Sequence, residues 1–246
     1  MYIRCTATGR DYFTPTMCLV GMGGMLVIGG CSGGQPAPPV ASQVVAAPTV
    51  AASASVGGGP PSALTQIGES AKELFDAART SRWNDAAASV QTLKESAATL
   101  SDTGLKPDLF TQLRSRLADL EDSEKARRRV QTMDYANSIT RIVAELCAPY
   151  QPAIPYRVVL LDYYGRQLEL GLAASRPSTI KQASADLRQT WNSVEPSILE
   201  HGHVEDARRF TDIVVQIEGA KRPADFVAPV RAELAEVGQL EKIFTP

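Results

Sequence analysis

Histidine, cysteine and aromatic residues are scarce in this chain of 246 residues, which has 2 His, 4 Cys and 6% aromatics. Neither sign of charge is in large excess, because 25 basic and 27 acidic residues leave a formal net charge of -2. A nucleic-acid partner is therefore not expected, since phosphate binding needs a basic surface. The chain also lacks a glycine-rich phosphate loop, a nucleophile elbow and a paired-histidine helix motif. We expect neither an enzyme nor a protein with a bound cofactor.

Long apolar runs are absent too, apart from one near the start. Residues 17–30, "MCLVGMGGMLVIGG", carry no charge. This run is shorter than the ~20 residues of a transmembrane helix, but it has the length of the apolar region of a signal peptide. Arg4 and Arg10 precede it and can serve as the positive region of such a signal. Residues 1–30 are therefore predicted to be a signal peptide.

The apolar run ends on "IGGC", which is Ile28, Gly29, Gly30 and Cys31. This stretch resembles the lipobox of bacterial lipoprotein precursors, in which an aliphatic residue and two small residues precede a cysteine. The resemblance implies diacylglycerol transfer to the Cys31 thiol, cleavage before Cys31, and N-acylation of the new terminus. It also implies a lipid-anchored protein of the bacterial cell envelope that faces the periplasm or the exterior. The alternative is an ordinary secretory signal with an incidental cysteine.

Two features follow from this assignment. Ser32 favours the outer membrane, because lipoproteins retained at the inner membrane of enteric-type bacteria often carry Asp at that position.

Loss of the signal would remove Cys5 and Cys18, and lipid would occupy Cys31. Cys147 would then be the remaining thiol, so the mature chain could not form an internal disulfide. Cys147 lies in the apolar stretch "RIVAELCAPY" and is expected to be buried and inert.

Residues 32–62, which follow the lipidated cysteine, contain neither a charged nor an aromatic side chain. Such a segment cannot bury enough surface to offset its ordering entropy. We therefore expect residues 31–62 to be a disordered Ala/Pro/Gly/Ser tether, with a span of roughly 30 Å for a flexible chain.

Residues 63–246 are predicted to form an all-α domain, because apolar residues recur there with the period of a helix. One example is the 4-3-4-3-4 spacing of Ile154, Val158, Leu161, Gly165, Leu168 and Leu172. Short connections predict antiparallel helical hairpins in a bundle or a short solenoid. The expected helices, about seven or eight, lie near 63–80, 84–100, 107–121, 123–148, 155–175, 178–200, 204–220 and 225–244.

The sequence leaves three features of the expected helices undecided. No Gly or Pro separates the third helix from the fourth, so a single long helix is the alternative. Pro196 and Pro229 are expected to kink or restart their helices. The hairpins around residues 73–95 and 168–191 look loosely alike, although no fixed repeat of about 34 residues emerges.

Candidate ligand-binding residues are few. Asp162, Tyr163 and Arg166 stand beside Gly165 in an otherwise apolar helix, and Asn137 lies near another apolar seam. These four residues are the candidate ligand site, although Asn137 is better explained as a residue that fixes helix register. His201 and His203 are weak metal candidates, because two alternating histidines need further ligands to complete a site. Capping of a helix end by a histidine and Gly202 explains that stretch better.

The predicted function is that of a membrane-anchored lipoprotein whose helical domain binds a protein partner or scaffolds an assembly. The alternative is a periplasmic helical bundle that binds a small ligand or a metal through the residues above. An exposed apolar groove would favour the first function, and an enclosed pocket lined by those polar residues would favour the second.

Overall fold

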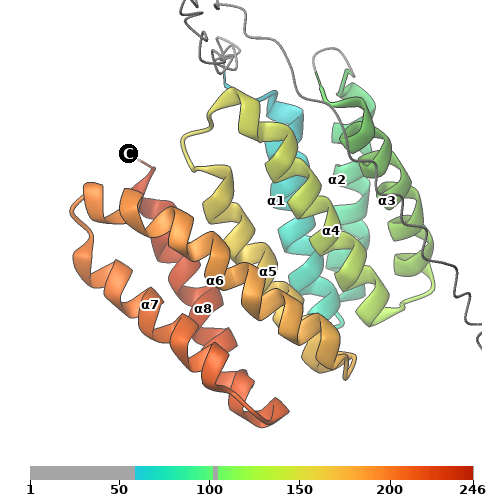
Figure 1. Cartoon of the computed structure of the whole chain (residues 1–246). Helices are drawn as coiled ribbons and strands as arrows, with labels where there is room; N and C mark the ends of the chain where they lie inside the picture. The colour runs from blue at the N-terminus through green and yellow to red at the C-terminus, as the bar shows by residue number, and fades with distance from the viewer. Residues whose placement is uncertain (1–58, 102–104, 246) are drawn as a thin grey trace, which may run out of the picture. The chain divides into compact units, whose positions relative to one another are not determined.

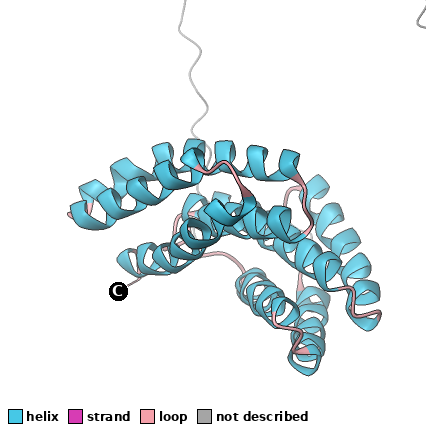
Figure 2. Ribbon diagram, turned by 90° about the horizontal axis from the view of Figure 1, so that it is seen from below, coloured by secondary structure: helices cyan, strands magenta, loops and turns pink. Residues whose placement is uncertain are grey.

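The computed structural model describes residues 59–101 and 105–245. This part of the chain contains helices and loops and no strand, as Figure 2 shows, so the predicted all-α class is confirmed. The predicted signal peptide, Cys31 and nearly all of the predicted tether lie outside the described residues.

The described residues form eight α-helices, whose bounds agree closely with the predicted map. The first four are α1 (Ser62–Arg79), α2 (Trp83–Thr99), α3 (Pro107–Lys125) and α4 (Arg129–Cys147). A short 3-10 turn, η1 (Ala148–Tyr150), follows α4. The last four are α5 (Tyr156–Ala173), α6 (Pro177–Glu200), α7 (Val204–Gly219) and α8 (Pro223–Ile243).

The eight helices form two four-helix bundles that follow each other along the chain (Figure 1). In the first bundle α1 packs on α2 and α4, and α3 packs on the same two helices. In the second bundle α5 packs on α6 and α8, and α7 completes the ring. Each bundle has its own hydrophobic core, and α4 packs against α5 to join the two.

The two bundles repeat each other at a fixed distance in the sequence. Helices α1 and α5 begin at Ser62 and Tyr156, and α2 and α6 begin at Trp83 and Pro177, both 94 positions apart. Helices α4 and α8 are separated by the same 94 positions. The first turn of each bundle uses a serine with positive φ, Ser81 at 57° and Ser175 at 52°. The likeness of the two hairpins therefore belongs to a repeat of four helices rather than two.

The alternative of one long helix across α3 and α4 is wrong. Arg127 has a φ of 51°, in the left-handed region, and α4 starts two residues later. The N–H of Arg128 donates to the carbonyl of Ser123 over 2.9 Å, the bond that closes a Schellman turn. A non-glycine residue thus ends this helix, so the absence of Gly and Pro does not make α3 and α4 one helix, and the predicted division into two is correct although it lies a few residues later.

The two internal prolines do not divide their helices. Helix α6 runs through Pro196 and α8 runs through Pro229. Val194 and Ile198 flank Pro196 and are both buried in the second core. Their burial holds the helix together where proline removes a backbone hydrogen bond.

Helices α5 and α8 approach each other closely at Gly165. A Cβ atom at this position would lie 2.7 Å from Cδ of Glu233 and 2.9 Å from Cδ2 of Leu234. Both distances are shorter than real Cβ contacts, so a larger residue here would force the side chains of Glu233 and Leu234 to move. At this crossing the carboxyl group of Glu233 lies against the backbone of α5 at Gly165, near the charged groups of Asp162 and Arg166.

Candidate functional site

Asp162 and Arg166 lie one turn apart on α5 and form a buried ion pair. The Nε atom of Arg166 donates to both carboxylate oxygens of Asp162, over 3.1 and 3.0 Å. The guanidinium also lies over the ring of Phe75, 4.6 Å from its centroid. Burial by itself lowers the pKa of Arg166, but Asp162 and Asp76 outweigh this effect and raise it above its usual value. The cation is therefore permanently charged.

This pair extends into a cluster that joins the two bundles. The two terminal nitrogens of Arg166 donate to Asp76 on α1, over 3.4 and 3.5 Å. Lys72 on α1 bonds to Glu241 on α8 over 2.7 Å, and its Nζ lies 3.9 Å from Asp162. We call these five residues the inter-bundle cluster. It places two cations among three carboxylates and links α1, α5 and α8.

Glu233 on α8 lies next to this cluster and is fully buried. Its two carboxyl oxygens have no hydrogen-bond partner among the described residues. Burial raises the pKa of Glu233 well above its usual value, and the nearby Asp162 raises it further, while Arg166 opposes the shift. The uncharged acid is thus the form that fits this position.

Asn137 on α4 is fully buried and connects the two bundles elsewhere. Its Nδ2 atom donates to the backbone carbonyl of Tyr163 on α5, over 3.0 Å. Its Oδ1 atom has no partner within the described part of the chain. A side-chain bond to a backbone carbonyl of the facing helix fixes the register of α4 against α5, the structural role expected for Asn137.

Tyr163 is the last of the four candidate residues and also lies on α5. Its ring makes an edge-on contact with Tyr164, with centroids 5.0 Å apart. Burial raises its pKa. Asp162 and Arg166 line a cavity of about 620 Å³ together with Asp76, whereas Asn137 and Tyr163 are not among its lining residues. This cavity therefore brings together only two of the four candidate ligand residues.

His201 and His203 flank Gly202 at the junction of α6 and α7, where Gly202 has a φ of 83°. Nδ1 of His201 lies 2.7 Å from the carbonyl oxygen of Ser197, and Nδ1 of His203 lies 2.9 Å from Asp206. His201 thus contacts a carbonyl of the last turn of α6, in agreement with the capping interpretation, whereas His203 contacts a side chain of α7 and makes no cap hydrogen bond. Within residues 59–101 and 105–245, no three His, Cys, Asp or Glu side chains gather as a possible metal site.

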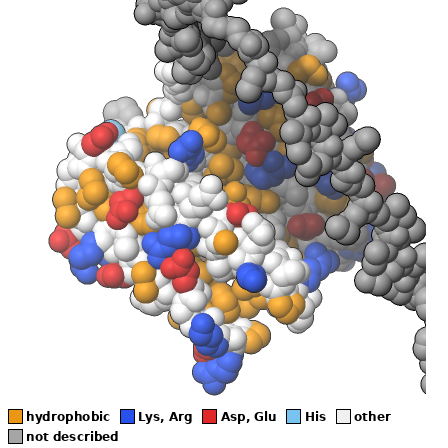
Figure 3. All heavy atoms as spheres, in the orientation of Figure 1, with side chains coloured by type: hydrophobic (Ala, Val, Ile, Leu, Met, Phe, Trp, Pro, Cys, Tyr) orange, Lys and Arg blue, Asp and Glu red, His pale blue; other side chains and the backbone are white. Residues whose placement is uncertain are grey.

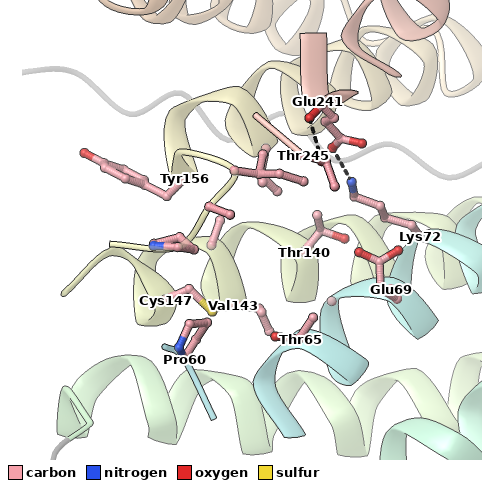
Figure 4. Close-up of a pocket in the computed structure, with 16 residues that line it drawn as sticks. Pro60, Thr65, Glu69, Lys72, Thr140, Val143, Cys147, Tyr156, Glu241 and Thr245 are labelled. Carbon is pink, nitrogen blue, oxygen red and sulfur yellow. Dashed lines mark hydrogen bonds and ion pairs between the residues drawn. The ribbon is translucent and has the colours of Figure 1, made fainter. Parts of the chain in front are cut away.

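A second cavity, of about 290 Å³, was not anticipated from the sequence. It lies where α1, α4 and α8 meet the loop before α5 (Figure 4). Cys147 lines this cavity and is buried, as predicted. Burial raises the pKa of Cys147 to about 11, so the thiol is protonated near neutral pH and a poor nucleophile. Its lining comes from four separate segments, which no local motif could have revealed.

The outer surface shows no single-sign field on the face seen in Figure 3, where acidic and basic side chains are interspersed. Many of them pair within one helix, such as Arg208 with Glu205 and Asp212. No helix in the described part of the chain is long and apolar enough to cross a bilayer.

Comparisons of the chain with protein-family models, curated proteins and solved structures gave no match.

The buried Glu233 should make the stability of the fold depend on pH. The folded chain holds a proton on Glu233 that the unfolded chain releases near its ordinary pKa of 4.5. Its contribution to stability is therefore lost as the pH rises from 4.5 toward the raised folded value. The variant Glu233→Gln cannot ionise at this position. As the pH rises from 5 to 8, we therefore expect its free energy of unfolding to increase relative to that of the native chain. Urea denaturation at several pH values measures this difference.

The matched control is Glu73→Gln, a change of the same kind at an exposed position of α1. The difference between this variant and the native chain at each pH is the baseline for the difference measured with Glu233→Gln. A difference for Glu233→Gln that stays constant relative to this baseline from pH 5 to pH 8 would contradict a protonated Glu233.

Proposed function

We propose that the chain is a lipid-anchored protein of the bacterial envelope whose helical body binds a protein partner. The anchor rests on the lipobox-like "IGGC", the uncharged run before it and the two preceding arginines. Two acyl chains on a cysteine anchor a protein stably, at ~0.8 kcal/mol per buried CH₂, where one chain binds reversibly. With such an anchor, the proposed function does not require a membrane-spanning segment.

An apolar groove between α2 and α3 is the observation that carries the partner-binding function. It has a volume of about 420 Å³. Its floor and walls are formed by small and apolar side chains, namely Ala97, Ala98, Leu100, Phe110, Leu113, Leu117 and Ala118. Most of these residues are only partly buried, so the chain leaves apolar surface open along two neighbouring helices.

The second bundle shows why this groove is open. Trp191 on α6 stands 94 positions after Ala97, and its ring packs against Phe210 on α7 with centroids 4.5 Å apart. The indole is fully buried between α6 and α7 at this level, while a cavity of about 470 Å³ lies between the same two helices nearer the start of α6. Ala97 has only a methyl group at the matching position of α2, so the space between α2 and α3 remains unfilled.

The rim of the groove indicates the chemistry of the partner. Lys94 and Arg114 stand on the rim with one carboxylate, Glu121. Lys94 and Lys125 both bond to Glu121, over 2.9 and 2.8 Å, whereas Arg114 lies over the ring of Phe110. The rim thus carries an excess of positive charge. A groove of this shape suits an amphipathic helix of the partner with apolar residues at helical spacing and acidic neighbours.

Cys31→Ala tests the anchor. Because the alanine has no thiol to accept diacylglycerol, we expect the variant to leave the membrane fraction and the native chain to remain there. Mass spectrometry of the native amino terminus should show an acylated Cys31. Unchanged membrane fractionation of the variant, or an intact and unacylated Met1 on the native chain, would contradict the anchor.

Photo-crosslinking tests the groove. With a benzoylphenylalanine probe placed at Ala98 or at Ala118 of the full chain in envelopes, we expect the same partner adduct from both positions. A probe at Ala88, an exposed residue of α2 outside the groove, should give no such adduct. Leu117→Glu should reduce the adduct at least tenfold, because it places a carboxylate on the apolar wall.

Ala88→Glu is the matched control for that substitution and should leave the adduct unchanged, and circular dichroism should show both variants to be helical. The same adduct from Ala88, or full capture by Leu117→Glu, would show that the partner does not use the groove.

A further inference from the structure

The cavity that contains Cys147 has two chemically different ends. Figure 4 shows Glu69, Lys72, Thr140 and Glu241 gathered at one end, with Cys147 and Pro60 at the other. We call it the amphipathic pocket. Its volume of about 290 Å³ lies near the lower limit of small-molecule sites.

Small side chains keep the apolar end open. Gly68 on α1 has no side chain, and a Cβ there would lie 3.3 Å from Cγ1 of Val143 on α4. Ala144 contributes only a methyl group one residue further along α4, and Ile154 and Val159 complete the apolar lining on the other side. The small volume that remains suits one unbranched alkyl chain.

The residues that line the charged end include two carboxylates, Glu69 and Glu241, and one ammonium group, Lys72. Lys72 bonds to Glu241 over 2.7 Å, and Asp162 lies 3.9 Å from its Nζ atom. An anionic ligand would have to displace one of these carboxylates to reach Lys72. Glu69 also lines the pocket and faces the same space, so a cation can enter without breaking an ion pair.

We propose that the amphipathic pocket binds a short single-chain amphiphile with a cationic head, such as an alkylammonium. The alkyl chain lies between α1 and α4 toward Cys147. The ammonium group lies beside Glu69, where it compensates the excess negative charge. This site is separate from the α2–α3 groove, and neither depends on the other.

Cys147 serves as the reporter of occupancy. The full chain is treated with methyl methanethiosulfonate, a small reagent selective for thiols, and the labelling of the Cys147 peptide is followed by mass spectrometry. Octylamine and octanoate are compared below their micelle-forming concentrations, together with 1-octanol below its solubility limit. We expect octylamine to slow the labelling of Cys147 at least tenfold at saturation. The half-effect concentration should be at least tenfold higher for octanol and higher still for octanoate.

Two variants locate the ligand. Glu69→Gln should raise the half-effect concentration of octylamine about fivefold to tenfold and leave that of octanol unchanged, because it removes one charge from the head-group end. Ala144→Leu should abolish the protection of Cys147 by octylamine and by octanol, because the larger side chain fills the apolar end of the pocket, where the alkyl chain binds. Ala88→Leu, at an exposed site on α2, is its matched control and should behave as the native chain does.

Glu69 is exposed, so Glu69→Gln keeps the test valid even where Ala144→Leu fails to fold. The proposal is overturned when octanoate protects Cys147 as well as octylamine does, or when octylamine acts equally on Glu69→Gln and on the native chain. It is also overturned when no probe protects Cys147. In that last case, faster labelling after deletion of residues 44–58 would identify the chain's own tether as the occupant.

Discussion

The buried ion pair of Asp162 and Arg166 is the interaction on which the arrangement of the two bundles depends. Removing two charges from water costs several kcal/mol per ion unless their hydrogen bonds are satisfied. Here Arg166 bonds to Asp162 on its own helix and to Asp76 on α1 of the other bundle. Since the guanidinium is satisfied only when both bundles are in place, the pair makes their docking specific rather than merely apolar.

This cluster also decides where open space remains between the bundles. Lys72, Glu241 and Asp162 hold α1, α5 and α8 together around the middle of the contact, and Gly165 lets α5 and α8 meet there. On one side of this tight region lies the amphipathic pocket, and on the other lies the charged cavity lined by Asp162 and Arg166. Lys72 thus has two roles, as a structural cation and as a wall of the pocket.

The helices themselves could be predicted from the sequence because their signals are local. Proline at the first helical position marks α3, α6 and α8, and apolar residues at helical spacing mark the faces that are buried. The left-handed turn at Arg127 escaped notice because a residue other than Gly or Asn adopts it. The helix predicted over 178–200 does not restart at Pro196, because burial of the neighbouring residues in the core overrides the local preference of proline.

The candidate site was predicted only in part, for a related reason. Asp162 and Arg166 could be paired from their spacing of four residues, which puts them on one helix face. Their partners on α1 and α8 are distant in sequence, and no periodicity signals that Asp76, Lys72 or Glu241 will meet them. The α2–α3 groove depends on Ala97 standing where the second bundle has Trp191, and that comparison requires the 94-residue repeat to be recognised first.

Hydrogen exchange of Arg166→Met measures most directly whether the inter-bundle cluster holds the two bundles together. Breaking a buried ion pair costs ~3 kcal/mol or more, which corresponds to exchange faster by a factor on the order of 100. We expect this acceleration in the core amides of both α1 and α5, and little change in Arg116→Met, which breaks the exposed pair of Arg116 and Asp119. Acceleration confined to α5–α8, with α1 as protected as in the native chain, would contradict a cluster that joins the bundles.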